Sequence, residues 1–112
     1  MPHALEAEIN QLHAEICAGL ADPKRIIILY ALSERPHTVH ELTVTLELSQ
    51  PLVSRHLKVL RDRGMVTANR IGSSVEYRLA DVRLIQALDL LRSVLRENLA
   101  HRAELAGVIH PE

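Results

Sequence analysis

Aromatic side chains and cysteine are nearly absent from this sequence. Its 112 residues include two tyrosines, no phenylalanine, no tryptophan and one cysteine. Leucine, isoleucine, valine and alanine must therefore fill the core, which is modest for a chain of this length, and residues 1–112 are expected to form one domain. A single cysteine excludes a disulfide framework within the chain and is typical of a protein in the reducing cytoplasm.

The sequence also lacks a long apolar run, a signal-peptide core and a large charge of either sign. Its apolar runs are too short to span a membrane, so we expect a cytoplasmic protein without a membrane partner. The formal net charge of −1 excludes a uniformly basic nucleic-acid coat but allows a local basic patch. No Gly-rich phosphate loop, nucleophile–base pair or closed metal site is evident, which argues against an enzyme.

The first predicted helix covers residues 4–18. Its apolar residues recur at helical spacing and form one narrow stripe, which comprises Leu5, Ile9, Leu12 and Ile16. A narrow stripe is typical of a helix that lies against another helix. That other helix can belong to the same domain or to a second subunit.

Asp22-Pro23 predicts the start of a second helix, because Asp is a favourable N-cap and Pro is tolerated at the first helical position. The aliphatic run Ile26–Leu29 would also suit a strand. The continuing segment Tyr30–Leu32 favours a helix that is buried on most sides, and Glu34–His37 break it.

Residues 38–63 have the pattern of a helix-turn-helix. Thr38 and Glu41 form a capping box at the start of a short helix, and Ser49 can cap the next helix. The second helix has a buried stripe and ends at Gly64. The residues of that stripe are Val53, Leu57 and Leu60.

The face of this helix opposite the stripe is polar, with Ser54, Arg55, Lys58 and Arg61, and with Gln50 at the entry. Such side chains bond base edges and phosphates in the major groove of DNA. An ordinary amphipathic helix with a solvated polar face is the alternative. The surrounding charge favours DNA, because residues 50–79 contain six basic and two acidic residues, and the negative charge lies elsewhere in the chain.

After Gly64 the apolar pattern changes to the two-residue period of a strand. Residues 65–71 are rich in Val, Thr and Ile, Gly72–Ser74 form a turn, and Val75, Tyr77 and Leu79 then alternate with charged residues. This pattern predicts a two-stranded β-hairpin over residues 65–80. A hairpin of this size is unstable alone, so it must lean on the helices as the wing of a winged helix-turn-helix.

The last predicted helix covers residues 82–105, with Asp81 as its cap, and Gly107 and Pro111 end it. Its apolar stripe is larger than one domain face needs and comprises Leu84, Leu88, Leu91, Leu95 and Leu99. The predicted fold is therefore mainly α: five helices, with the two-stranded hairpin between the fourth and the fifth.

This order of elements resembles the ArsR/SmtB family of bacterial winged-helix repressors from about Ala18 to Leu105. The resemblance is carried by Leu20–Leu29, His40–Val66 and Arg70–Leu79. The middle segment contains S-x-H-L-x-x-L-x-x-x-G followed by a wing, a family hallmark. The resemblance implies a homodimeric transcriptional repressor that binds imperfect palindromes in double-stranded DNA and is released by an inducer.

The resemblance also implies the contact residues. The DNA-binding set is Ser49, Gln50, Pro51, Ser54, Arg55, Lys58, Arg61, Arg70, Ser73 and Ser74. Gln50, Pro51, Ser54 and Arg55 would read bases, Lys58 and Arg61 would hold phosphates, and the last three would serve the wing. The dimer interface, formed by the terminal helices 4–18 and 82–105, would comprise Leu5, Ile9, Leu12, Ile16, Leu84, Leu88, Leu91 and Leu95. His56 is assigned to the buried side.

The two metal sites best known in this family are not matched. Thr43 and Thr45 stand where many relatives have cysteines, and they cannot supply thiolates. At the second site only Asp81 and Glu97 can bind a cation, because the other two positions are Arg83 and Val94. We therefore predict no tight metal binding at either place and assign no cofactor.

Other ligand-capable pairs exist at helical spacing, namely His13 with Cys17 and Glu97 with His101. A small buried cysteine and a surface histidine paired with a glutamate are the alternative interpretations. A winged helix that binds only protein is the competing function, and the basic patch argues against it. The sequence does not identify the inducer, the operator or the regulated genes.

Overall fold

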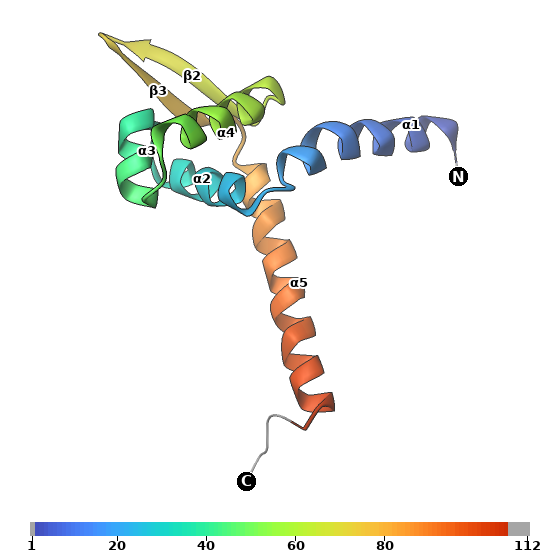
Figure 1. The fold of residues 1–112 in the computed structure, drawn as a ribbon. Helices are drawn as coiled ribbons and strands as arrows, with labels where there is room; N and C mark the ends of the chain where they lie inside the picture. The colour runs from blue at the N-terminus through green and yellow to red at the C-terminus, as the bar shows by residue number, and fades with distance from the viewer. Residues whose placement is uncertain (1, 108–112) are drawn as a thin grey trace. The chain divides into compact units, whose positions relative to one another are not determined.

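The computed structural model describes residues 2–107. The helices are α1 (His3–Leu12), its π-helical continuation η1 (His13–Cys17), α2 (Pro23–Glu34), α3 (Val39–Leu46), α4 (Gln50–Asp62) and α5 (Arg83–Leu105) (Figure 1). The strands are β1 (His37–Thr38), β2 (Val66–Ile71) and β3 (Ser74–Leu79). The predicted winged helix-turn-helix with five α-helices is confirmed. Pro111, predicted beyond the end of the last helix, lies outside the described residues.

The chain divides into two compact units, one from Met1 to Val82 and one that begins at Arg83 and consists of α5. None of the described helices has the length and apolar character needed to cross a membrane.

The starts of α2 and α4 follow the predicted capping chemistry. The Asp22 carboxylate accepts a hydrogen bond from the Lys24 amide at 2.8 Å, and the Ser49 hydroxyl oxygen accepts one from the Leu52 amide at 3.4 Å. The strand alternative for Ile26–Leu29 is excluded, because these residues lie in α2. The prediction that α2 is buried on most sides is wrong at Ile27, whose side chain is 50% exposed.

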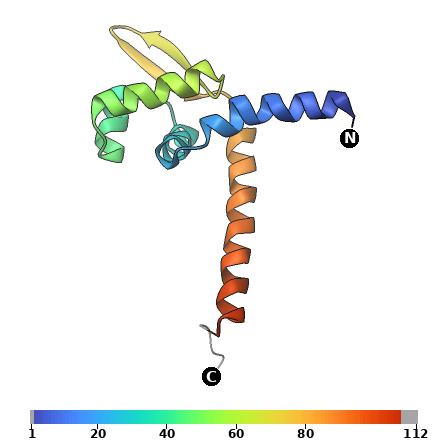
Figure 2. The same cartoon turned by 45° about the vertical axis from the view of Figure 1, so that its right-hand side comes forward.

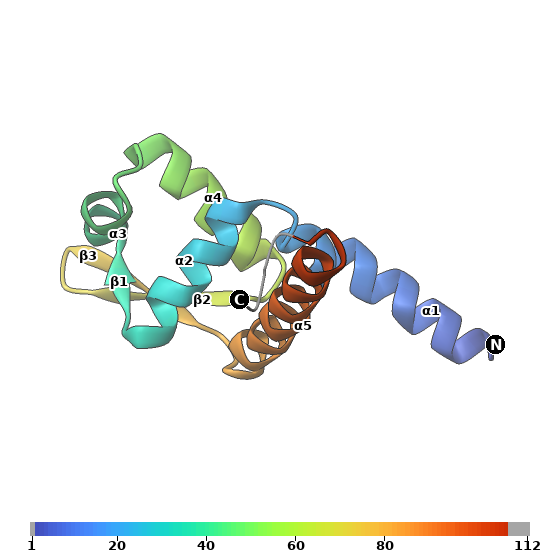
Figure 3. The ribbon, with the colours of Figure 1, turned by 90° about the horizontal axis from the view of Figure 1, so that it is seen from below.

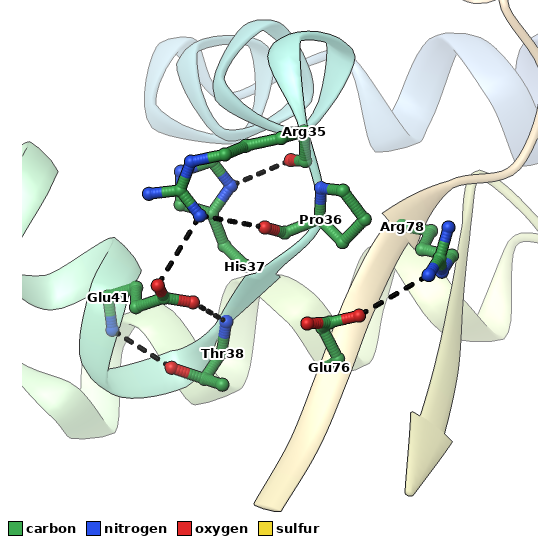
Figure 4. Close-up of polar contacts among 7 residues, drawn as sticks. All are labelled: Arg35, Pro36, His37, Thr38, Glu41, Glu76 and Arg78. Atoms are coloured by element: carbon green, nitrogen blue, oxygen red, sulfur yellow. Dashed lines mark hydrogen bonds and ion pairs between the residues drawn. The ribbon is translucent and has the colours of Figure 1, made fainter. Parts of the chain in front are cut away.

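The capping box of α3 is present: the Thr38 amide donates to the Glu41 carboxylate at 2.9 Å, and the Glu41 amide donates to the Thr38 hydroxyl at 3.2 Å (Figure 4). The turn between α3 and α4 contains no glycine. Glu47 instead adopts a left-handed conformation, with a φ of 54°. This conformation is uncommon for a residue with a Cβ, and here it reverses the chain after α3.

Gly64 ends α4 as predicted. Its φ is +72°, its amide donates to the Arg61 carbonyl, and the Met65 amide donates to the Leu60 carbonyl at 2.9 Å. These two bonds satisfy carbonyls that the last helical turn leaves without partners. They also direct the chain into β2, which supplies one edge of the sheet.

The sheet has one more strand than predicted, and its order is β1-β3-β2. β1 pairs His37 with Tyr77 and Thr38 with Glu76, while β2 pairs Ile71 with Ser74. Ser74 therefore begins β3 instead of completing the turn. The helix break predicted at Glu34–His37 is therefore followed at once by a strand, because β1 begins at His37. The His37 ring is buried, and its Nδ1 lies 2.8 Å from the Arg35 carbonyl oxygen (Figure 4).

The core of the first unit lies between α2, α3, α4 and the start of the hairpin, as seen from below in Figure 3. Its most enclosed side chains are aliphatic apart from one methionine, as the shortage of aromatic residues requires. They are Ile28, Leu29, Leu42, Val53, Leu57, Leu60, Met65 and Val66. All three residues of the predicted α4 stripe belong to this core, so the opposite face of α4 points away from it.

The helix predicted over residues 4–18 is not a uniform α-helix, because residues 13–17 are π-helical. The Arg63 guanidinium, at the end of α4, donates to the carbonyl oxygens of Ala14 at 2.7 Å and Glu15 at 3.2 Å. A side chain that engages backbone carbonyls is a recognised cause of such a local change in helical winding. Arg63 therefore ties the first helix to the base of α4.

Candidate nucleic-acid interface

The polar face of α4 is fully presented to solvent. All ten residues predicted to contact DNA are exposed, whether they lie on α4 or on the hairpin. The buried residues of α4 are confined to the other side of the helix and comprise Val53, His56, Leu57 and Leu60. The helix is thus divided lengthwise into a side that completes the core and a side with no internal role. Figure 2 shows α4 directly below the hairpin in that view.

The basic residues of α4 differ in whether they form ion pairs within the chain. Lys58 forms an i,i+4 ion pair with Asp62, with 3.0 Å between Nζ and Oδ2, and both side chains are mostly exposed. Such a surface pair contributes little to stability. Within residues 2–107, neither Arg55 nor Arg61 has a hydrogen-bond or ion-pair partner. Their guanidinium donors are available to an anionic ligand.

A groove of about 490 Å³ runs between α4 and β3, and its lining residues are Ser54, Lys58, Arg61, Asp62 and Tyr77. Sequence reasoning missed Tyr77, which its alternation with Val75 and Leu79 placed on the inner side of the wing. The residue type could have indicated this position, because a tyrosine has an apolar ring and a polar hydroxyl that needs water or another hydrogen-bond partner. An inward-facing tyrosine beside a polar helix is suited to the wall of a groove.

At the tip of the hairpin, Arg70, Ser73 and Ser74 are exposed around Gly72, whose φ is +63°. Ile71, also at the tip, is 54% exposed. Further along β3, Arg78 forms an ion pair with Glu76 at 3.4 Å (Figure 4). The structure therefore presents one arginine and two hydroxyls together at the predicted wing tip.

A polar cluster lies under the buried side of α4. Arg25 donates to the Gly19 carbonyl at 2.8 Å and to the Ala18 carbonyl at 3.2 Å, and its Nη1 is 3.4 Å from Nδ1 of His56. A guanidinium can only donate, so Nδ1 of His56 is the acceptor and the ring proton is on Nε2. That Nε2 is buried without a hydrogen-bond partner in the described chain, 4.0 Å from the Asp22 carboxylate.

Burial lowers the pKa of His56 below its usual value of 6.5, and the nearby Asp22 carboxylate only partly opposes this effect. The hydrogen bond from the Lys24 amide lowers the pKa of Asp22, which stays ionised. His56 is therefore neutral at pH 7, as its assignment to the buried side requires. It joins α4 to the start of α2.

The predicted dimer residues are largely exposed. On α1, Leu5, Ile9 and Leu12 are each 42–49% exposed, and on α5, Leu91 and Leu95 are 60% and 51% exposed. Ile16 and Leu84 are partly exposed. Leu88 is the exception, because it is only 5% exposed in a single chain. The assignment of these residues to a dimer interface stays a prediction.

The candidate metal ligands remain in pairs. His13 and Cys17 are both exposed on η1, and Glu97 and His101 are exposed on α5. Within residues 2–107, no three histidine, cysteine, aspartate or glutamate side chains gather in a way that could hold a metal. The absence of tight metal binding at the two family sites stays a prediction.

Comparison with known proteins agrees with the architecture. The profile described as "Bacterial regulatory protein, arsR family" matches residues 22–68. The HTH-type transcriptional repressor SmtB of Mycobacterium tuberculosis is 49% identical over 74 residues, which are 66% of this chain and 55% of that protein. The chain thus spans little more than half the length of that relative. The HTH-type transcriptional regulator NmtR of the same organism is 38% identical over 76% of this chain and 71% of its own length.

Among solved structures, the homodimeric winged helix-turn-helix DNA-binding domain of a possible ArsR-family regulator from Mycobacterium bovis has a TM-score of 0.76. It is 26% identical, and the match covers 90% of this chain and 93% of that one. The fold is that of a winged helix-turn-helix domain. The two relatives from Mycobacterium tuberculosis are described as a transcriptional repressor and a transcriptional regulator. The chain belongs to the ArsR family of bacterial regulatory proteins.

Proposed function

We propose that this protein is a sequence-specific DNA-binding transcriptional regulator of the cytoplasm, acting as a homodimeric repressor. The observation that carries the proposal is the lengthwise division of α4, whose core side is buried while Gln50, Ser54, Arg55, Lys58 and Arg61 are all exposed. Two similar proteins support the proposal. SmtB of Mycobacterium tuberculosis is described as a transcriptional repressor, and the Mycobacterium bovis domain as a homodimeric DNA-binding domain.

The first turns of α4 carry the groups suited to reading bases. A glutamine such as Gln50 can pair with adenine, and an arginine such as Arg55 can pair with guanine through two hydrogen bonds. Pro51 has no donor and offers only an apolar ring, which suits contact with a thymine methyl group. The Ser49 oxygen accepts the cap hydrogen bond, so its hydroxyl proton remains available to a phosphate.

The remaining exposed cations suit the phosphate backbone. Lys58 and Arg61 follow the base-reading turns along α4, and Arg70 lies with two serine hydroxyls at the wing tip. Contacts of this kind position a protein on DNA without reading its sequence, and they make binding depend on salt. The local basic patch supplies this attraction despite a net charge of −1.

Exposed apolar side chains on α1 and α5 support the homodimer. Leu5, Ile9, Leu12, Leu91 and Leu95 are all at least 42% exposed, an unusual amount of leucine and isoleucine surface for an isolated small chain. Two copies related by a twofold axis would place two α4 helices on two half-sites of an imperfect palindrome. Dimerisation therefore also sets the operator symmetry.

Release by an inducer is the last part of the proposal. An inducer must bind the DNA-free state more tightly than the DNA-bound one. Thr43 and Thr45 cannot supply thiolates, and Arg83 and Val94 cannot ligate a metal. We therefore propose that zinc, cadmium and arsenite do not act at the two sites known in relatives. A metal that does act would use His13 with Cys17 or Glu97 with His101.

Selection from genomic DNA tests the proposal. The purified protein is incubated with sheared genomic fragments at moderate salt, and the retained fragments are sequenced. Enrichment of an imperfect inverted repeat is expected for the wild type and for Lys24→Ala, which removes an exposed charge on α2. Arg55→Ala should weaken that enrichment and relax the preference at one base position. Failure of the wild type to retain any sequence preferentially would contradict DNA reading and favour a protein-binding winged helix.

A further inference from the structure

The groove between α4 and β3 contains two residues, Tyr77 and Asp62, that have no part in the DNA contacts proposed above. Ser54, Lys58 and Arg61 lie at i, i+4 and i+7 and therefore line one side of α4. Tyr77 lines the groove from β3, and Asp62 adds a carboxylate beside the two cations. Two hydroxyls, an ammonium and a guanidinium thus share one groove with a single acid.

We propose that this groove seats a backbone phosphate of the bound DNA, that Tyr77 donates its hydroxyl to that phosphate, and that Asp62 restrains the affinity. This inference rests on the proposed function. A phosphodiester has only acceptor oxygens and one negative charge, so it requires donors and cations. Ser54, Tyr77, Lys58 and Arg61 supply both, and charge-assisted bonds from the last two are the stronger ones.

The position of Tyr77 is determined by the strand that the sequence did not reveal. β3 is the central strand, and Tyr77 pairs with Ala68 of β2 on one side and with His37 of β1 on the other. β1 is in turn anchored to α3 by the Thr38–Glu41 capping box (Figure 4). A hydroxyl on a backbone fixed from both sides loses less freedom when it binds a ligand.

Asp62 acts against the same phosphate. Its carboxylate is 3.0 Å from Nζ of Lys58, so an incoming phosphate must compete for that ammonium and approach a like charge. Lys58 precedes Asp62 in the chain, the less favourable orientation of an i,i+4 pair, so the pair is readily broken. Asp62 thereby lowers affinity for every DNA sequence and leaves more of the binding to depend on base contacts.

Two substitutions test the groove by fluorescence anisotropy, with the selected operator and a scrambled duplex of equal length. Tyr77→Phe removes one oxygen and keeps the ring, and it should weaken binding to both duplexes by about two- to tenfold. Asp62→Asn should tighten binding to both by about two- to fivefold, because the phosphate then neither competes with a carboxylate for Lys58 nor approaches a like charge.

Matched controls are available in the same chain. Tyr30→Phe removes the hydroxyl of the only other tyrosine, on α2. Asp89→Asn removes an acid that pairs with Arg92 on α5 at 3.4 Å. Both control variants should bind the two duplexes like the wild type. A change equal to that of the groove variants would overturn the assignment to the groove.

The outcomes separate this inference from the proposed function. If Tyr77→Phe and Asp62→Asn both bind like the wild type while Arg55→Ala relaxes operator preference, the groove is not a phosphate seat, although DNA reading stands. A Tyr77→Phe effect restricted to the operator would make Tyr77 a base contact and also overturn the inference. If the wild type binds neither duplex, the proposed function itself fails. Should Tyr77→Phe not fold, Asp62→Asn decides the question.

Discussion

The apolar side chains of the segment from α2 to β3 differ in solvent exposure from those of the terminal helices α1 and α5. In the first region, Ile28, Leu29 and Leu57 are completely buried. On α5, Leu91 and Leu95 are more than half exposed, and α1 has no buried residue. The difference indicates that the winged-helix region completes its own core and leaves a polar face for a ligand. The terminal helices leave apolar faces, which we propose a second copy covers.

The largest expected effect comes from a substitution in the core of the segment from α2 to β3. Leu57→Ala, in the buried stripe of α4, should lower the free energy of unfolding by about 2–5 kcal/mol because it leaves a cavity in the core. Urea denaturation followed by circular dichroism measures this loss. The difference in the free energy of unfolding between variant and wild type should be the same at every protein concentration at which both proteins are dimers. A loss below about 1 kcal/mol would show that α4 is not part of the core.

The terminal helices should respond differently. Leu91→Asp places a charge on the exposed apolar face of α5 and should weaken dimer association by about 1–3 kcal/mol, while the winged-helix region stays folded. Sedimentation velocity over a range of concentrations measures the shift from dimer to monomer. Gln86→Asp, at an exposed polar position of α5, is the control and should leave the dimer unchanged. Equal association of Leu91→Asp and wild type would exclude this face from the interface.

The polar face of α4 should separate base reading from phosphate binding. Arg55→Ala should cost about 1–3 kcal/mol on the operator and relax preference at one base position. Lys58→Ala should weaken binding to all sequences and reduce the slope of log affinity against log salt by about one. Titrations of both variants against operator and scrambled DNA measure these effects. If both variants match the wild type, α4 does not contact DNA.

The smallest expected effect concerns pH. Burial lowers the pKa of His56 below 6.5, so the unfolded chain takes up the proton at a higher pH than the folded chain does. The stabilising contribution of neutral His56 is therefore present above the ordinary pKa of 6.5 and is lost as the pH falls below 6.5 toward the lower pKa of the folded state. Thermal unfolding between pH 7.5 and 5.5 should show this decline in the wild type and a weaker one in His56→Gln. Identical declines would assign it to other groups.

Features encoded locally could be predicted from the sequence. The start of α2 at Asp22-Pro23, the capping box at Thr38 and Glu41, and the end of α4 at Gly64 all depend on residues within a few positions of each other. Their chemistry is the same in any fold, because caps satisfy backbone groups that every helix end exposes. The buried stripe of α4 could also be predicted, because its apolar residues recur with the period of a single helix.

Features that depend on distant residues could not be predicted. The π-helical turn of residues 13–17 accompanies hydrogen bonds from Arg63, which lies 48 and 49 positions from its two carbonyl acceptors. β1 has only two residues and therefore no period to detect. Tyr77 enters the candidate site because α4 and β3 lie beside each other.

The most direct test of the account is the mass of the protein with and without DNA. Sedimentation of the wild type at micromolar concentration should show a dimer alone, and two chains per duplex when the selected inverted repeat is added. This result is predicted because we propose that the apolar faces of α1 and α5 hold two copies together and that two α4 helices bind two half-sites. A monomer that does not sediment with the duplex would contradict the central claim.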